Sequence, residues 1–223
     1  MTDSTQRPGR RGSALSKDRI VQAAISILDN EGAAGLTFRA LAGRLKTGSG
    51  AIYWHVADKD ELLAAATDHV IAKFEPQDVG RLSPQEAIRA LALGVFDAID
   101  SHPWVGAQLS GNPFQYAVLR ILEGLGTQVV ALGIPEKGRF NAATALLSFM
   151  LGLAAQYAVA SHHFRDGSDR TTALRAVAAK WMELDPEQHP FIHQVAPLLP
   201  VHDDREQFMA GIDLILAGID TSR

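Results

Sequence analysis

Leu36–Leu63 reads LTFRALAGRLKTGSGAIYWHVADKDELL, and this stretch decides the expected fold of the first part of the chain. A helix is predicted to start at Thr37, because its hydroxyl can accept a hydrogen bond from a free backbone amide of the first turn. Three apolar residues recur at helical spacing and give this helix one buried face: Leu41, Ala42 and Leu45. A helix this short needs a partner to cover that face.

A tight turn is expected at residues 46–50 (KTGSG), where two glycines stand beside two hydroxyl residues. This composition ends one helix and starts another, with either Thr47 or Ser49 as the cap. The chain is therefore expected to change direction sharply here, so that the two helices cross.

The second helix is expected within residues 51–56 (AIYWHV), with Ile52 and Val56 packed against the first helix. Trp54 fits a core position and an exposed position equally well. The side chains that divide between packing and display to solvent are Tyr53, Trp54 and His55.

A third helix is expected to begin at Asp58 and to carry apolar residues as far as Phe74. Glu61 stands three residues after Asp58, a spacing typical of a capping box. The two shorter helices, joined by a tight turn with the second one at the surface, form the geometry that places a helix in the major groove of DNA.

The charge distribution also favours DNA as a partner of the N-terminal part. Residues 1–59 contain nine Lys or Arg and five Asp or Glu, whereas the whole chain of 223 residues has a formal net charge of −4. Lys and Arg bind DNA by neutralising its phosphates. Segment 1–13 is expected to be a flexible basic arm that either follows DNA or has no role, and it holds Arg7, Arg10 and Arg11.

These motifs resemble the N-terminal domain of the TetR family of bacterial transcriptional regulators, and within it the tetracycline repressors. The resemblance rests on Leu36-Thr37-x-Arg39-x-Leu41-Ala42 and on the sequence YWHV at 53–56, followed by Lys59 and the pair Leu62-Leu63. It is strong over residues 17–65 and weaker beyond. It implies a ligand-responsive regulator, expected to be a repressor, that binds a palindromic operator as a homodimer and is released by a small-molecule effector.

The resemblance also implies roles for individual residues. Arg39 would reach a base edge, and residues at the start of the recognition helix would read bases. Lys46-Thr47-Gly48 departs from the family's usual turn, so the register of that helix stays open. The full set of expected DNA-binding residues is Thr37, Arg39, Ser49, Gly50, Ala51, Tyr53, Trp54, His55 and Lys59.

The whole chain is predicted to be all-α. After the arm, residues 14–62 would form a helix-turn-helix DNA-binding domain, and residues 63–223 a helical effector-binding and dimerisation domain. The first domain includes an amphipathic helix over 17–31 that Gly32 ends. Further helices are expected over 84–101, 114–132, 140–163, 172–184 and 203–220, with a short segment at 104–109, a loop at 165–172 and turns over 186–200.

The helices expected over 140–163 and 203–220 are too apolar to face water. By resemblance, the corresponding helices pair across a two-fold axis, which implies a homodimer that reads two half-sites. The alternative is that both apolar surfaces serve the core of one chain.

Several classes of function are disfavoured. The chain has no cysteine, which excludes thiol catalysis, disulfides and cysteine zinc sites. The histidines show no good metal-binding spacing, and no phosphate-binding loop follows a strand. We therefore expect no enzyme activity, no cofactor, no membrane segment and a cytoplasmic location. The alternative function is a helical small-molecule carrier or enzyme without sequence-specific DNA binding.

The second domain is expected to hold the effector in a mostly apolar pocket. Gln108 aligns with a histidine that binds drug-bound magnesium in tetracycline repressors, and an amide is a weaker ligand, so the effector is expected to differ from tetracycline. The candidate pocket residues are Trp104, Gln108, Asn112, Phe114, Tyr116, Phe149 and Tyr157.

Overall fold

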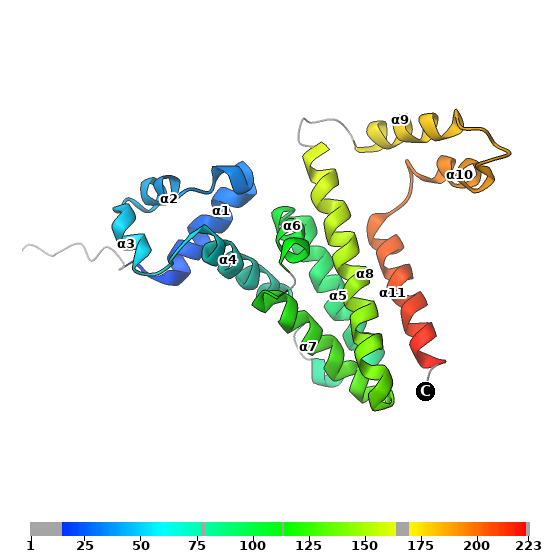
Figure 1. Ribbon diagram of the computed structural model, residues 1–223, viewed down its shortest axis with the longest axis horizontal. Helices are drawn as coiled ribbons and strands as arrows, with labels where there is room; N and C mark the ends of the chain where they lie inside the picture. The colour runs from blue at the N-terminus through cyan, green and yellow to red at the C-terminus, as the bar shows by residue number, and fades with distance from the viewer. Residues whose placement is uncertain (1–14, 77–78, 113, 164–169, 222–223) are drawn as a thin grey trace, which may run out of the picture. The chain divides into compact units, whose positions relative to one another are not determined.

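A computed structural model describes residues 15–76, 79–112, 114–163 and 170–221 (Figure 1). Every regular element in these ranges is a helix, which confirms the all-α prediction. The chain forms two compact units, Met1–Ala66 and Thr67–Arg223. The predicted domain boundary after residue 62 remains a prediction. The arm at 1–13 and most of the predicted loop at 165–172 lie outside the described residues.

The N-terminal unit is built from α1 (Lys17–Gly35), α2 (Phe38–Leu45), α3 (Ser49–Tyr53) and the first part of α4 (Lys59–Phe74). The Ser16 hydroxyl caps α1 by accepting from Arg19 N at 3.3 Å. The prediction that Gly32 ends the first helix is partly wrong. Gly32 breaks the helix with φ 69°, and a further turn then continues to Gly35.

The core of this unit comes from the apolar faces predicted for its helices. α1 contributes a stripe in which Ile20 and Ala24 are fully buried. α2 contributes Leu41, and α3 contributes Ile52, both with no exposed surface. Because each helix has one such face, α2 is held between α1 and α3, with which it makes contact.

The C-terminal unit holds the remaining helices. After the second part of α4 come a 3₁₀ turn (Val79–Arg81), α5, α6, α7, α8, α9, α10, a second 3₁₀ turn (Ala196–Leu198) and α11. The helix bounds are α5 Pro84–Ser101, α6 Trp104–Gly111, α7 Tyr116–Ala131, α8 Glu136–His163, α9 Arg170–Met182, α10 Pro190–Val195 and α11 Asp204–Asp220. The expected short segment at 104–109 is thus a helix. The prediction of turns throughout 186–200 is wrong at α10, which Pro190 starts because proline suits the first helical position.

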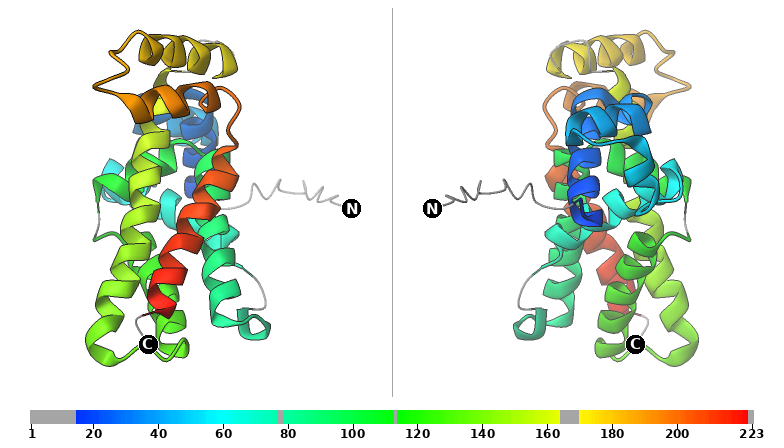
Figure 2. Two further views of the ribbon diagram at one scale, coloured as in Figure 1. Left: turned by 90° about the vertical axis from the view of Figure 1, so that its right-hand side faces the viewer. Right: turned by 90° about the vertical axis from the view of Figure 1, so that its left-hand side faces the viewer.

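Helix α8 organises this unit, since it contacts α5, α6, α7 and α11. Figure 2 shows α8 and α11 running side by side. Between them and α5 lies a row of stacked rings, in which Phe208 packs 5.4 Å from Phe96 and 5.5 Å from Phe149. These helices therefore share an aromatic core.

Candidate nucleic-acid interface

The first helix of the helix-turn-helix starts where the sequence predicts. The Thr37 hydroxyl accepts a hydrogen bond from Ala40 N at 3.1 Å, which satisfies one free amide of α2. The helix places Arg39 at the surface, while Leu41 faces the core. An exposed guanidinium next to a fixed helix start is available to a base edge or a phosphate.

The turn between α2 and α3 is made by Lys46, which adopts the left-handed conformation at φ 52° and ψ 47°. Its N–H donates to Gly43 O at 3.3 Å, and Thr47 N donates to Ala42 O at 3.0 Å. This pair of hydrogen bonds is the Schellman arrangement, in which glycine usually stands. Lys46 therefore occupies the position of a turn glycine.

The recognition helix α3 begins directly after residue 48, which lies between the two predicted caps. Gly48 is the cap residue and makes no side-chain capping bond, so the prediction of Thr47 or Ser49 as the cap is wrong. Ser49 and Gly50 are exposed and Ala51 is half-buried. Small residues at the tip let the helix backbone come close to a DNA surface.

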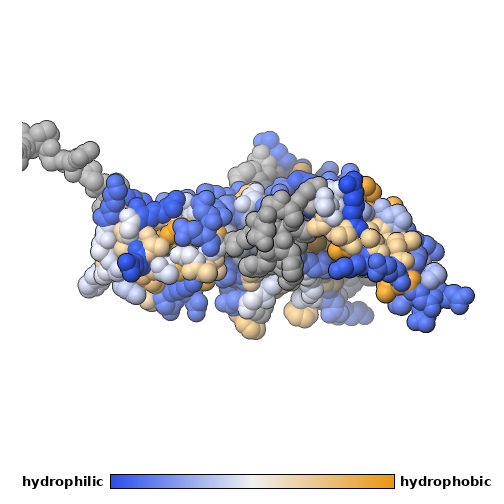
Figure 3. Space-filling view, turned by 90° about the horizontal axis from the view of Figure 1, so that it is seen from above, coloured by the Kyte–Doolittle hydropathy of each residue, from blue (hydrophilic) through white to orange (hydrophobic). Residues whose placement is uncertain are grey.

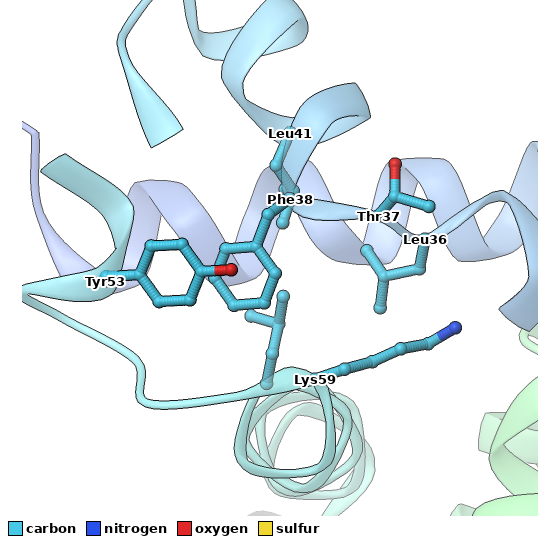
Figure 4. Close-up of a pocket in the computed structure, with 7 residues that line it drawn as sticks. Leu36, Thr37, Phe38, Leu41, Tyr53 and Lys59 are labelled. Atoms are coloured by element: carbon cyan, nitrogen blue, oxygen red, sulfur yellow. The ribbon is translucent and has the colours of Figure 1, made fainter. Parts of the chain in front are cut away.

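An aromatic stack joins the two helices at their far ends (Figure 4). The rings of Phe38, the first residue of α2, and Tyr53, the last of α3, lie 4.2 Å apart between centroids and 5° from parallel. Tyr53 is 54% exposed and Trp54 is 89% exposed, so the core alternative for Trp54 is wrong. Sequence reasoning missed Phe38, whose only sign was an aromatic residue directly after the cap.

His55 and Lys59 follow the recognition helix. His55 is half-buried just beyond the end of α3. The Lys59 ammonium donates to the carbonyl oxygen of Ala33 at 2.6 Å, which ties α4 to the end of α1. Beside the Lys59 stem is an open cleft of about 340 Å³, lined by Leu36, Thr37, Phe38, Leu41, Tyr53, Lys59 and Leu62.

The start of α4 is fastened by two carboxylates. Asp58 Oδ1 accepts from Glu61 N at 2.8 Å, which is the first of the two bonds of the predicted capping box. Glu61 reaches back to Ala57 N at 2.8 Å, and its other oxygen lies 2.8 Å from Lys17 Nζ. The hydrogen bond from Ala57, and after it the one from Lys17, lower the pKa of the Glu61 carboxyl. Because Lys17 belongs to α1, its ion pair with Glu61 holds α4 against the start of α1.

In the C-terminal unit the candidate effector residues occupy different environments. Trp104 is buried, and Gln108 and Phe149 are half-buried. A Cβ atom at Gly211 would lie 2.8 and 2.9 Å from two ring carbons of Phe149, which shows how tightly that ring is packed. Asn112, Phe114 and Tyr116 are exposed, and the side chain of Tyr157 lies outside the described residues.

Other kinds of site find little support in the described part of the chain. It contains no cluster of three or more His, Asp or Glu residues that could hold a metal ion. None of its helices is long and apolar enough to cross a membrane. On the face shown in Figure 3, hydrophobic surface appears as separate patches among hydrophilic residues.

Comparison with known proteins agrees with this geometry. The profile of bacterial regulatory proteins of the tetR family matches residues 20–66, and the profile of the tetracyclin repressor-like C-terminal domain matches residues 76–223. A Streptomyces coelicolor transcriptional regulator of known structure, SCO7222, is 47% identical, with a TM-score of 0.82 over 94% of this chain and 99% of that one.

Two further relatives are more distant. An HTH-type transcriptional regulator from Saccharopolyspora erythraea is 28% identical over 80% of this chain and 77% of its own. Mycobacterium smegmatis BioQ is 26% identical, with a TM-score of 0.67 over 94% of this chain and all of that one. BioQ has also been solved with its natural double-stranded DNA operator.

Proposed function

Because the chain belongs to the tetR family of bacterial regulatory proteins and is a transcriptional regulator, we propose that it is a repressor that binds a palindromic operator as a homodimer. A small-molecule effector held by the C-terminal unit releases it. The observation that carries the DNA part is the surface of α2 and α3, where Arg39, Tyr53 and Trp54 are all exposed. Acting on DNA in a bacterium, the protein works in the cytoplasm.

The role proposed for each residue on the surface of α2 and α3 follows from the chemistry of its side chain. Arg39 offers the planar donor set that suits guanine, so it reads sequence. Ser49, Gly50 and Ala51 bring the α3 backbone close to the groove floor and add few donors of their own. Tyr53 and His55 contact phosphate or sugar and set the register, and the remaining discrimination comes from DNA shape.

Lys59 has a more limited role in this proposal. Its ammonium group already donates to Ala33 O, so binding a phosphate requires it to share or leave that bond. Thr37 is likewise committed to capping α2 through its hydroxyl oxygen, although its hydroxyl hydrogen remains a donor. Both residues line the cleft beside Tyr53 and can support a phosphate placed at its mouth.

Dimerisation is assigned to α8 and α11. On α8 the exposed residues Ala145, Ser148, Gly152 and Ala155 recur at intervals of three and four and so share one face of the helix. On α11, Ala210, Leu214 and Ala217 do the same. Small and apolar side chains allow close approach of a second pair of helices, and a two-fold dimer presents two recognition helices to two half-sites.

The effector site is assigned to the C-terminal unit, with Trp104 and Gln108 of α6 as its first candidates. The buried indole and the half-buried amide suit a mostly aromatic ligand with one polar contact. Gln108 lacks the imidazole that binds the magnesium of a metal-drug complex, so the ligand is a compound other than tetracycline. A tight, magnesium-dependent tetracycline complex contradicts this assignment.

Selection of bound sequences from a random duplex pool tests the function directly. Recovery of one inverted repeat, bound by two chains per duplex, supports a dimeric sequence-specific regulator and supplies the probe for effector screening. Enrichment of no sequence, with binding that depends on salt alone, indicates a sequence-indifferent DNA binder and contradicts the proposal.

A further inference from the structure

We propose that Phe38 is a positioning residue for DNA binding, which holds Tyr53 and the end of the recognition helix in place through their stacked rings. The proposal rests on the DNA contact assigned to Tyr53 above. Phe38 itself is half-buried and needs no contact with DNA in this role.

The stack connects the two helices at a critical point. Phe38 is the first residue of α2 and Tyr53 the last of α3, so a single ring pair links the beginning of one helix to the end of the other. The centroid separation of 4.2 Å and the angle of 5° describe nearly parallel rings in contact. One face of Tyr53 is therefore covered by Phe38, and this contact restricts the directions its hydroxyl end can take (Figure 4).

Helix α3 depends on such a contact because little else in its sequence stabilises it. It spans five residues, its cap Gly48 makes no side-chain hydrogen bond, and it contains Ser49 and Gly50, which are weak helix formers. A helix this short does not persist through its own hydrogen bonds. Ile52, with no exposed surface, anchors it at one point, and the ring of Tyr53 provides a second.

The same stack also bears on base reading. Phe38 stands between the cap Thr37 and the exposed Arg39, so its ring contact with Tyr53 bears on the same first turn of α2 from which Arg39 projects. Since Tyr53 is 54% exposed, the pair lies at the surface and its loss leaves no deep cavity. Removing Phe38 is therefore expected to harm DNA binding far more than folding.

The experiment measures affinity for the inverted-repeat duplex recovered by selection, using the full-length protein and thermal melting as the folding check. Phe38→Ala is expected to weaken DNA binding about tenfold, a loss of about 1.4 kcal/mol of binding free energy. Its melting temperature should change only slightly. Phe38→Tyr keeps the stack and is expected to bind within about twofold of the parent. Phe191→Ala, which removes a 68% exposed ring from α10, is the matched control and leaves affinity unchanged.

A double-mutant cycle separates positioning from general damage. If Phe38 acts through Tyr53, the double variant Phe38→Ala/Tyr53→Ala binds no worse than Tyr53→Ala alone. Additive losses, or normal binding by Phe38→Ala, overturn the inference while leaving the Tyr53 contact intact. Normal DNA binding by Tyr53→Ala overturns both the positioning role of Phe38 and the DNA contact proposed for Tyr53. If Phe38→Ala fails to fold, Phe38→Leu removes the planar stack and keeps most of the volume, and the same cycle applies.

Discussion

Arg120 Nε lies 3.5 Å from Asp68 Oδ1, so α7 is joined to the second part of α4 by an ion pair within the C-terminal unit. Both atoms are buried, and their separation is too long for a hydrogen bond but short enough for strong attraction. Arg120 Nη1 also lies 3.3 Å from Glu75, and its guanidinium sits 5.2 Å from the Tyr116 ring. Burial lowers the pKa of Arg120, but Asp68 and Glu75 outweigh it, so the pKa is raised.

Replacing this arginine is expected to destabilise the C-terminal unit. Arg120→Ala leaves two carboxylates close together without their counter-charge and should lower the free energy of unfolding by about 1–3 kcal/mol, between the values for exposed and buried pairs. Arg120→Lys keeps the charge but not the branched donor set, and should recover part of the loss. Urea unfolding measures both; equal stability of Arg120→Ala and the parent contradicts the role given to the ion pairs.

The lowered pKa of Glu61 predicts a pH dependence for the N-terminal unit. The folded-state pKa is below the ordinary value of 4.5, so the contribution of Glu61 is present above pH 4.5 and is lost as the pH falls through the folded value. Glu61→Gln should therefore be less stable than the parent at pH 7, with the difference shrinking below pH 4.5. Lys17→Met should give a smaller loss, because the hydrogen bond from Ala57 is the larger cause. If the stability difference between Glu61→Gln and the parent is the same at pH 7 and pH 3, the Glu61 carboxylate does not have this stabilising role.

Lys46 offers a test of the turn between α2 and α3. A residue other than glycine in the left-handed region is strained, and Lys46 has φ 52°. Lys46→Gly should raise the free energy of unfolding by up to about 1 kcal/mol, whereas Lys46→Ala keeps the strain and should not. Chemical unfolding of the three proteins distinguishes these results. A Lys46→Gly protein less stable than Lys46→Ala argues against this turn geometry.

The dimer assignment can be tested with two equally exposed residues. Leu214 on α11 and Val201, which precedes α11, are each 75% exposed. Leu214→Glu places a charge in the proposed interface and should convert the dimer to monomer in sedimentation, with loss of binding to a two-site duplex. Val201→Glu should remain dimeric. The assignment fails if both variants stay dimeric or both dissociate.

Local capping chemistry made much of the fold predictable. Thr37, Asp58 and Ser83 each accept the amide three residues on, and Ser83 with Glu86 forms the full capping box. These bonds depend on neighbouring residues alone, so sequence spacing reveals them. Accuracy varied at the other helix bounds: α7 ends at Ala131, one residue before the predicted end, whereas α8 begins at Glu136, four residues before the predicted start.

The details of the site were harder to predict. The exposure of Trp54 follows from where α3 ends, and a five-residue helix has too few turns for periodicity to show its buried face. The Phe38 stack is a tertiary contact between helices and leaves no periodic sign. In the C-terminal unit, the aromatic residues 114 and 116 are apolar by type yet exposed, which composition alone could not reveal.

Sequence reading by Arg39 is tested most directly by the equilibrium affinity of Arg39→Ala for the selected inverted repeat and for a scrambled duplex at one fixed salt concentration. Arg39→Ala is expected to lose about 1–3 kcal/mol of the preference for the repeat, per half-site, while retaining much of its affinity for the scrambled duplex. Arg175→Ala, which removes an exposed arginine from α9, should match the parent on both duplexes. An Arg39→Ala protein that discriminates as well as the parent contradicts sequence reading by α2 and α3.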